Sequence, residues 1–201
     1  MNTFEALNAA IFLRINADLN TPQWKIGAAT FLADYLIYLI ALVLIGMWCW
    51  GKERQRNLAL KACLVALVAL GMNQIIILLW PHPRPFMVGL GHSFIAHLPD
   101  PSFPSDHATV FSAIGLTLVF SSVRSLIGWS VLAAGAAVAW ARVFLGVHFP
   151  LDMAGAVAVV CLVWAGMQPV WARAGNAITW QMEQIYRLVL AQPISHGWIR
   201  R

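Results

Sequence analysis

Charged residues are scarce in this chain of 201 residues: only 10% are Asp, Glu, Lys or Arg, whereas 60% are hydrophobic and the mean hydropathy is +0.72. Soluble domains are about half apolar and a quarter charged, so this composition excludes an ordinary soluble protein. The hydrophobic residues also come in long runs, and about 20 apolar residues cross a hydrocarbon core about 30 Å thick. We therefore expect one membrane-embedded domain over residues 1–201 with an all-α fold.

Paired cysteines, a signal peptide and a basic stripe are also missing. Cys49, Cys63 and Cys161 form no CxxC pair, so we interpret them as small buried hydrophobic residues, not as disulfides or metal ligands. The first 25 residues lack the positive start, apolar run and small-residue cleavage site of a signal peptide. The formal net charge of +5 does not indicate nucleic acid, because the basic residues gather in particular loops. We expect no nucleic-acid partner and no cofactor.

Five apolar segments are predicted to be transmembrane helices. They lie at about 27–50, 58–80, 107–122, 126–145 and 150–171. Residues 2–17 precede them as a short amphipathic helix that Asn2 can cap, and because it is too short and too polar to span, we expect it to lie in the membrane interface. The predicted polytopic membrane helix bundle has five transmembrane helices plus this N-terminal interfacial helix, six helices in all. For the mixed tail, a further interfacial helix near 177–191 is an open alternative.

The basic residues predict the orientation of these helices. One set of connectors, including a tight turn around Arg124, and the tail are flanked by Lys52, Arg54, Arg56, Lys61, Arg124, Arg173, Arg187, Arg200 and Arg201. By the positive-inside rule this side is cytoplasmic. Five of the six histidines lie on the opposite side. We therefore expect the polar chemistry to face the periplasm from a bacterial inner membrane.

Three polar segments lie at the outer ends of the predicted spans. They are His-Pro-Arg-Pro at 82–85, Pro-Ser-Asp-His at 104–107, and the spaced trio Arg142, His148 and Asp152. A helix bundle can bring these ends together. Arg84 and Arg142 are forked donors suited to phosphate oxygens. Ser105 adds a hydroxyl beside the unpaired N–H groups that open the third span.

The histidines supply the remaining parts of a phosphoryl-transfer site. One of His107 and His148 can attack phosphorus while the other protonates the departing oxygen. Asp152, one helical turn from His148, can hold that imidazole in the right tautomer. Taken singly, each residue has a simpler explanation, such as a headgroup anchor for Arg142 or an acidic helix start for Asp152. As an ordered set on one face, they indicate phosphoryl transfer that requires no metal.

These segments resemble the signature motifs of the phosphatidic acid phosphatase type 2 superfamily. The family pattern is a lysine seven positions before Arg-Pro, then Pro-Ser-Gly-His, then Ser-Arg followed by His and Asp. Within this superfamily the chain is similar to bacterial undecaprenyl pyrophosphate phosphatases of the bacitracin-resistance kind. The similarity includes Phe-Pro-Ser-Asp-His at 103–107 and Gly-Val-His-Phe-Pro-Leu-Asp at 146–152.

The resemblance implies a role for each matching residue. His148 would be the nucleophile that becomes a phosphohistidine, Asp152 its orienting partner and His107 the general acid. The residues expected to hold the phosphate are Arg84, Ser105 and Arg142. The partner implied is a lipid pyrophosphate in the membrane.

Three positions depart from the family pattern. Ile77 stands where the lysine is expected, Asp106 replaces the glycine of the second motif, and Ala141 replaces the serine of the third. Loss of a cation weakens the phosphate clamp. By sequence, His82 is the nearest residue that could compensate, and Lys25 is a looser candidate.

Asp106 places a negative charge beside the expected phosphate site. Such a charge is costly unless Asp106 pairs with Arg84 or raises the pKa of His107. We therefore count Asp106 and His82 among the candidate substrate-binding residues.

Other polar residues in or near the spans have weaker assignments. Asp34, near the outer end of the first span, either borders the site or faces headgroup water. Asn73 and Gln74 are expected to form interhelical hydrogen bonds. The spacing is too loose to predict a metal site from His92, His97 and Asp100.

The leading interpretation is hydrolysis of undecaprenyl pyrophosphate to undecaprenyl phosphate. The substrate is implied by the resemblance, whereas the reaction type also follows from the residues. Alternatives are phosphatidylglycerophosphate or phosphatidate as substrate, or transfer of the phosphate to another lipid. A phosphate-binding transporter is disfavoured because the spans show no paired broken helices and few charges at mid-depth. An inactive family member is disfavoured by the presence of His107, His148 and Asp152.

Overall fold

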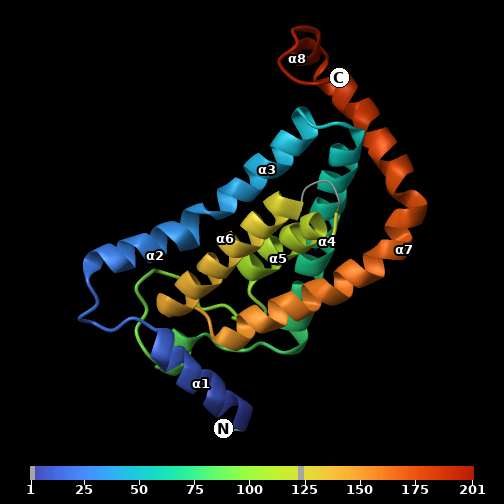
Figure 1. The fold of residues 1–201 in the computed structure, drawn as a ribbon. Coiled ribbons are helices and arrows are strands. Elements are labelled where there is room, and N and C mark those ends of the chain that lie inside the picture. Colours follow the sequence, from blue (N-terminus) through green and yellow to red (C-terminus); the bar gives the residue numbers. More distant parts are fainter. Residues whose placement is uncertain (1–2, 122–124) are drawn as a thin grey trace.

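Helices account for the regular structure of the described residues (Figure 1). The computed structural model describes residues 3–121 and 125–201. Its elements are α1 (Thr3–Ile15), α2 (Gln23–Tyr35), α3 (Ile37–Cys49), α4 (Glu53–Leu79), the short 3₁₀ helix η1 (Pro85–Val88), α5 (Asp106–Val119), α6 (Ser125–Phe144), α7 (Pro150–Val189) and α8 (Ala191–Ser195). The all-α prediction is confirmed. The predicted cap Asn2 and the turn at Arg124 fall outside the described residues.

Four helical segments among the described residues are long and apolar enough to cross a membrane. They are Gln23–Cys49, Glu53–Leu79, Ser125–Phe144 and Pro150–Val189. The apolar helix α5 has only 14 residues, which at 1.5 Å rise per residue gives about 21 Å. A hydrocarbon core is about 30 Å thick. The predicted count of five spans is therefore not confirmed by helix length and composition.

The first predicted span, 27–50, is divided into two helices. α2 and α3 meet at Leu36, which keeps right-handed helical angles (φ −62°, ψ −24°), so the chain continues in helical geometry across the junction. α2 also begins four residues earlier than predicted, directly after Pro22. Hydropathy misses this first turn because Gln23 and Lys25 are polar, although both are compatible with a helix.

The last helix extends beyond the predicted span 150–171, because α7 continues without a break to Val189 and includes the proposed 177–191 segment almost entirely. Pro169 lies inside this helix, and Figure 1 shows that α7 changes direction midway. Buried residues recur every four positions at Trp171, Gly175 and Thr179. This spacing gives the polar second half of α7 one packed face.

Arg56 anchors the C-terminal segment to the bundle. The sequence predicts only that it lies in a cytoplasmic connector, but its side chain is 2% exposed and its Nη1 lies 3.2 Å from Glu183 Oε1. Its Nη2 donates to the carbonyl oxygen of Arg200 at 2.6 Å, and its guanidinium lies 4.7 Å from the ring centre of Tyr186. The two charged residues are visible in the sequence. Their pairing could not be predicted, because the sequence does not show that the second half of α7 lies beside the start of α4.

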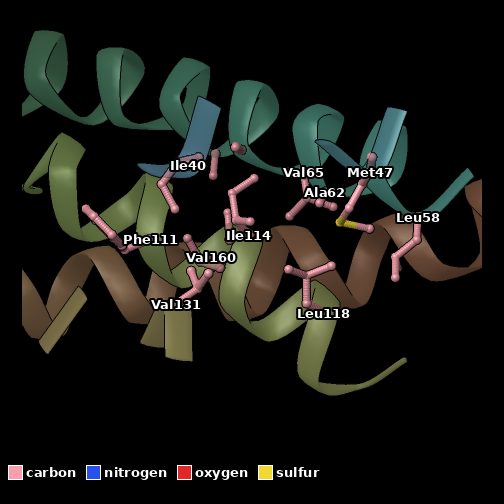
Figure 2. Close-up of a cluster of buried hydrophobic side chains, with 14 of the residues drawn as sticks. Ile40, Met47, Leu58, Ala62, Val65, Phe111, Ile114, Leu118, Val131 and Val160 are labelled. Carbon is pink, nitrogen blue, oxygen red and sulfur yellow. The ribbon is translucent and has the colours of Figure 1, made fainter. Parts of the chain in front are cut away.

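The main hydrophobic core lies where α3 to α7 meet. Figure 2 shows side chains from all five helices in this core: Ile40, Met47, Leu58, Ala62, Val65, Phe111, Ile114, Leu118, Val131 and Val160. Large apolar side chains also point outward, and Leu78 and Leu126 are 82% and 80% exposed. An apolar outer surface of this kind suits contact with lipid tails, not with water.

All three cysteines are free thiols, as predicted, but they are not all buried. Cys49 and Cys63 are partly buried, whereas Cys161 is exposed on α7. The prediction of burial is wrong for Cys161 because an apolar residue of a membrane helix can face lipid as well as the core.

Glycines bring α5 and α6 into close contact. A Cβ atom at Gly128 would collide with backbone atoms of Leu118 and Val119, and one at Gly135 would lie 2.6 Å from Cβ of Phe111. Small residues at a helix crossing let the backbones approach closely. This packing fixes the start of α5 beside the end of α6, where the polar residues gather.

Candidate active site

The three polar segments converge on one cavity of about 260 Å³. The segment after α4, the start of α5 and the region from the end of α6 to the start of α7 all contribute to it. Its lining residues are Gln74, Ile77, Arg84, His97, Asp100, Pro101, Pro104, Asp106, His107, Arg142 and His148. Five of the eight predicted site residues therefore share this cavity.

His148 is held from one side by Asp152. Nδ1 of His148 lies 3.1 Å from Oδ2 of Asp152, which also accepts the backbone N–H of Phe149 at 2.8 Å. The first turn of α7 places Asp152 here, and a turn at Gly146 (φ 85°) leads into it. A side chain at Gly146 would collide with the carbonyl oxygen of His92, so the glycine is required at this turn.

Arg84 holds the opposite side of the same imidazole. Its Nη1 lies 3.1 Å from Nε2 of His148 and 2.8 Å from the carbonyl oxygen of Val147. A guanidinium can only donate and a carboxylate can only accept. Nε2 of His148 therefore carries the lone pair, and Nδ1 carries the proton toward Asp152. This is the tautomer that a nucleophile at Nε2 requires.

The His148 imidazole is almost fully buried, with 3% of its surface exposed. Burial lowers the pKa of His148 below its ordinary value, although the hydrogen bond from its ring to Asp152 acts in the opposite direction. The ring is thus neutral at neutral pH, so Nε2 keeps its lone pair, which accepts the hydrogen bond from Nη1 of Arg84.

His107 and Arg142 form the other wall of the cavity. Nη2 of Arg142 lies 2.7 Å from Nδ1 of His107. Nε of Arg142 is buried and has no hydrogen-bond partner among the residues that the structure describes. An unpaired buried donor on a cation is costly, and a phosphate oxygen could satisfy it.

Ser105 and His82 lie outside the cavity lining. Ser105 is fully buried and caps α5, where its hydroxyl accepts from the backbone N–H of Ala108 at 3.5 Å. His82 packs edge-on against the rings of Trp80 and Phe149 and lies 3.4 Å from the Ser102 hydroxyl. Neither side chain lines the cavity, although the backbone N–H of Ser105 donates to the carbonyl oxygen of Asp152 at 3.2 Å.

Asp106 does line the cavity, but it does not form the expected pair with Arg84. Its Oδ1 accepts a hydrogen bond from Nδ2 of Asn73 at 2.9 Å, and the same Nδ2 donates to Thr109 at 2.9 Å. Asn73 thus joins α4 to α5, in agreement with its predicted interhelical role. Its neighbour Gln74 instead lines the cavity.

Arg84 pairs with Asp100, a residue that the sequence suggested only as a poor metal ligand. Nε of Arg84 lies 3.0 Å from Oδ1 of Asp100. Partial burial raises the pKa of the Asp100 carboxyl, but the hydrogen bond and charge of Arg84 more than offset this and hold the pKa below its ordinary value. Asp100 also lies 3.4 Å from Nδ1 of His97.

The loose metal alternative gains no support. His92 lies apart, with its backbone N–H bonded to Asn16 and its ring against Phe94. Residues 3–121 and 125–201 contain no group of three or more His, Cys, Asp or Glu side chains arranged to hold a metal ion. Asp34 and Lys25 are exposed on α2 and do not line the cavity.

Comparisons with known proteins agree with this site. The PAP2 superfamily matches residues 58–175. The chain is 35% identical to YbjG of Escherichia coli over 196 residues, covering 98% of each protein. It is 33% identical to the undecaprenyl-diphosphatase BcrC of Bacillus subtilis over 157 residues, covering 78% of this chain and 80% of that protein.

A solved structure shares the fold. It is the crystal structure of a transmembrane PAP2 type phosphatidylglycerolphosphate phosphatase from Bacillus subtilis, with a TM-score of 0.64 and 21% identity over 86% of this chain and 88% of that one. The matched residues 58–175 contain all of the polar residues that line the cavity. The chain therefore belongs to the PAP2 superfamily of membrane phosphatases.

Proposed function

We propose that the protein hydrolyses undecaprenyl pyrophosphate to undecaprenyl phosphate and inorganic phosphate. The observation that carries the proposal is the His148 imidazole in the cavity lining, held between Asp152 at Nδ1 and Arg84 at Nε2. The relative BcrC, 33% identical, is named for this activity, which supports the substrate.

In the first step, Nε2 of His148 attacks the terminal phosphorus. The N–P bond forms as the bond from that phosphorus to the bridging oxygen breaks, and Asp152 stabilises the positive charge that develops on the ring. His107 donates a proton to the departing oxygen of undecaprenyl phosphate. Arg142, with its unpaired Nε, binds the oxygens of the transferred phosphoryl group.

In the second step, a water molecule attacks the phosphohistidine. His107, now neutral, accepts a proton from this water, while the N–P bond breaks and returns the electron pair to Nε2. Inorganic phosphate leaves and His148 regains its starting tautomer. His107 thus acts as an acid in the first step and as a base in the second, and the proton that it gains is lost when its contact with Arg142 forms again.

Substrate binding must rearrange the contact between Arg142 and His107. Because the guanidinium donates to the ring, the facing nitrogen of His107 acts as an acceptor in the substrate-free state. A phosphate that binds between the two groups accepts the hydrogen bonds of Arg142. His107 is then free to gain the proton that it later donates. We infer that phosphate binding and protonation of His107 are coupled.

The polar cavity is expected to face the periplasm, with α5 as a fifth crossing of the inner membrane. α5 starts at the cavity, while Phe120 and Ser121 beyond its end share a pocket with Arg54 at the start of α4. α5 therefore joins opposite ends of α4. The basic residues at the second end support a cytoplasmic assignment there, and α1 remains the expected interfacial helix.

The experiment is release of inorganic phosphate by the purified full-length protein in detergent, with a chelator present. Undecaprenyl pyrophosphate is compared with phosphatidylglycerophosphate and phosphatidate at equal detergent fractions, and His148→Ala is the matched inactive variant. Preferential release from undecaprenyl pyrophosphate that disappears in His148→Ala supports the proposal. Preference for either phospholipid would contradict the substrate assignment.

A further inference from the structure

The fixed charges around the cavity leave a phosphate incompletely neutralised. Arg84 and Arg142 face Asp100 and Asp106 in the lining, so the two positive and two negative charges cancel. A phosphate monoester carries a charge of about −1.5 to −2 at pH 7. Ile77 lines the same cavity at the position where the family pattern has lysine, so the expected third cation is absent from its usual place.

We propose that His97 supplies this missing cation and binds the substrate phosphate as an imidazolium paired with Asp100. His97 lines the cavity together with Ile77, His107 and Arg142. Its ring centre lies 6.5 Å from that of His148. A phosphate in contact with His148 would thus lie within reach of His97, whereas His82 and Lys25 lie outside the cavity lining.

The hydrogen-bond partners of His97 show where its ring carries a proton. Nδ1 lies 3.4 Å from Oδ1 of Asp100 and 3.1 Å from the carbonyl oxygen of Leu98, and both of these atoms accept hydrogen bonds. Nδ1 therefore carries a proton. As an imidazolium, the ring would donate from Nε2 to a phosphate oxygen while Nδ1 donates to Asp100.

The ring also has room to turn toward a ligand. His97 lines a neighbouring cavity of about 430 Å³ as well as the site, and its side chain is 21% exposed. It is therefore not fixed in a packed core. Asp100 holds both His97 and Arg84, so one carboxylate positions two donors around the same phosphate.

The inference rests on the proposed phosphatase function, but it can be tested without turnover. Methylenediphosphonate, a pyrophosphate analogue with a P–C–P bridge, is titrated calorimetrically into the full-length protein in detergent. His97→Gln removes the charge, and His97→Gln combined with Ile77→Lys returns a cation to the family position. His92→Gln is the matched control, because this histidine lies in the same connector outside the cavity lining.

We expect His97→Gln to weaken binding about tenfold at about pH 6, the effect of losing one charge-assisted hydrogen bond. Ile77→Lys should restore binding in the His97→Gln background, and His92→Gln should bind as wild type. If His97→Gln binds as tightly as wild type, the proposal is wrong. The proposal is also wrong if His97→Gln loses binding and no lysine restores it, whether Ile77→Lys is added to His97→Gln or His97→Lys is used instead. The loss would then not be caused by the missing charge.

The lipid assay separates this inference from the proposed function. Wild-type protein that binds methylenediphosphonate through His97 but does not release phosphate from undecaprenyl pyrophosphate would retain the cation assignment and refute the substrate. If wild type and His97→Gln hydrolyse the lipid with the same KM, the substrate assignment is retained and the role of His97 is refuted.

Discussion

Nη1 of Arg84 lies 3.1 Å from Nε2 of His148, the nitrogen that we propose as the nucleophile. The same guanidinium bonds to Asp100, to the Pro101 carbonyl oxygen and to the Val147 carbonyl oxygen. Most of its donors are therefore used by the protein itself. Arg84 joins the connector before α5 to the connector before α7, and it fixes the His148 tautomer as well as offering charge to phosphate.

Replacement of Arg84 by Lys is expected to lower kcat about 10²-fold, the usual effect of removing one positioned donor from a charged transition state. Lysine keeps the charge but has no planar fork to reach Asp100, Val147 and His148 together. Phosphate-release kinetics measure the effect. Arg14→Lys, at an exposed position on α1, is the control and should match wild type; equal activity of both variants would refute the role of Arg84.

Replacement of Asp152 by Asn should lower kcat by about 10²- to 10⁴-fold with little change in KM, because an amide no longer enforces the proton on Nδ1 of His148. Oδ2 of Asp152 also accepts the Phe149 N–H, so the thermal unfolding midpoint must be measured in parallel. An active variant with unchanged kcat and a lowered midpoint would assign Asp152 to helix capping alone.

The pH profile provides a third prediction. Burial lowers the pKa of His148 below 6.5, so the free enzyme should keep a neutral nucleophile until the pH falls through that depressed value. The acid limb of kcat/KM, which reports free-enzyme ionisations, should therefore lie below about pH 6.5. The free energy of unfolding should also fall in acid, because His148 in the unfolded chain binds a proton more readily than in the folded protein. An acid limb well above pH 7 would contradict this environment.

The contact between α5 and α6 predicts a selective effect of small substitutions. Gly128→Ala should destabilise the protein by about 1–3 kcal/mol, the usual cost of overpacking, because its Cβ would meet backbone of α5 that cannot move aside. Gly166→Ala is the control, since a Cβ there meets no atom within 4 Å. Thermal unfolding of the two variants in the same detergent measures the difference; equal midpoints would contradict the close packing.

Local features of the sequence were enough to predict most of the long helices and the three converging segments. Long apolar runs locate α4 and α6 closely, and the spacing of His148 and Asp152 puts them on one helical turn. The full extent of α7 could not be predicted in this way, because its second half is stabilised by partners on α4 that are distant in the sequence.

The same reason explains the partners of the site residues. Their opposite charges suggest a pair between Asp106 and Arg84, but Asn73 on α4 donates to Asp106, and Arg84 pairs with Asp100. His97 lies in an irregular connector, where no periodicity shows which way a side chain points. Its position between the first two motifs was the only available signal.

The most direct test of the account is a rapid-quench reaction with undecaprenyl pyrophosphate labelled in the terminal phosphate, followed by peptide mapping. We predict transient label on the protein that is stable in alkali and lost in acid, as expected for a phosphohistidine, and located at His148. His148→Gln should show neither label nor phosphate release. Label on a different residue, or phosphate release by His148→Gln at the wild-type rate, would contradict the central claim.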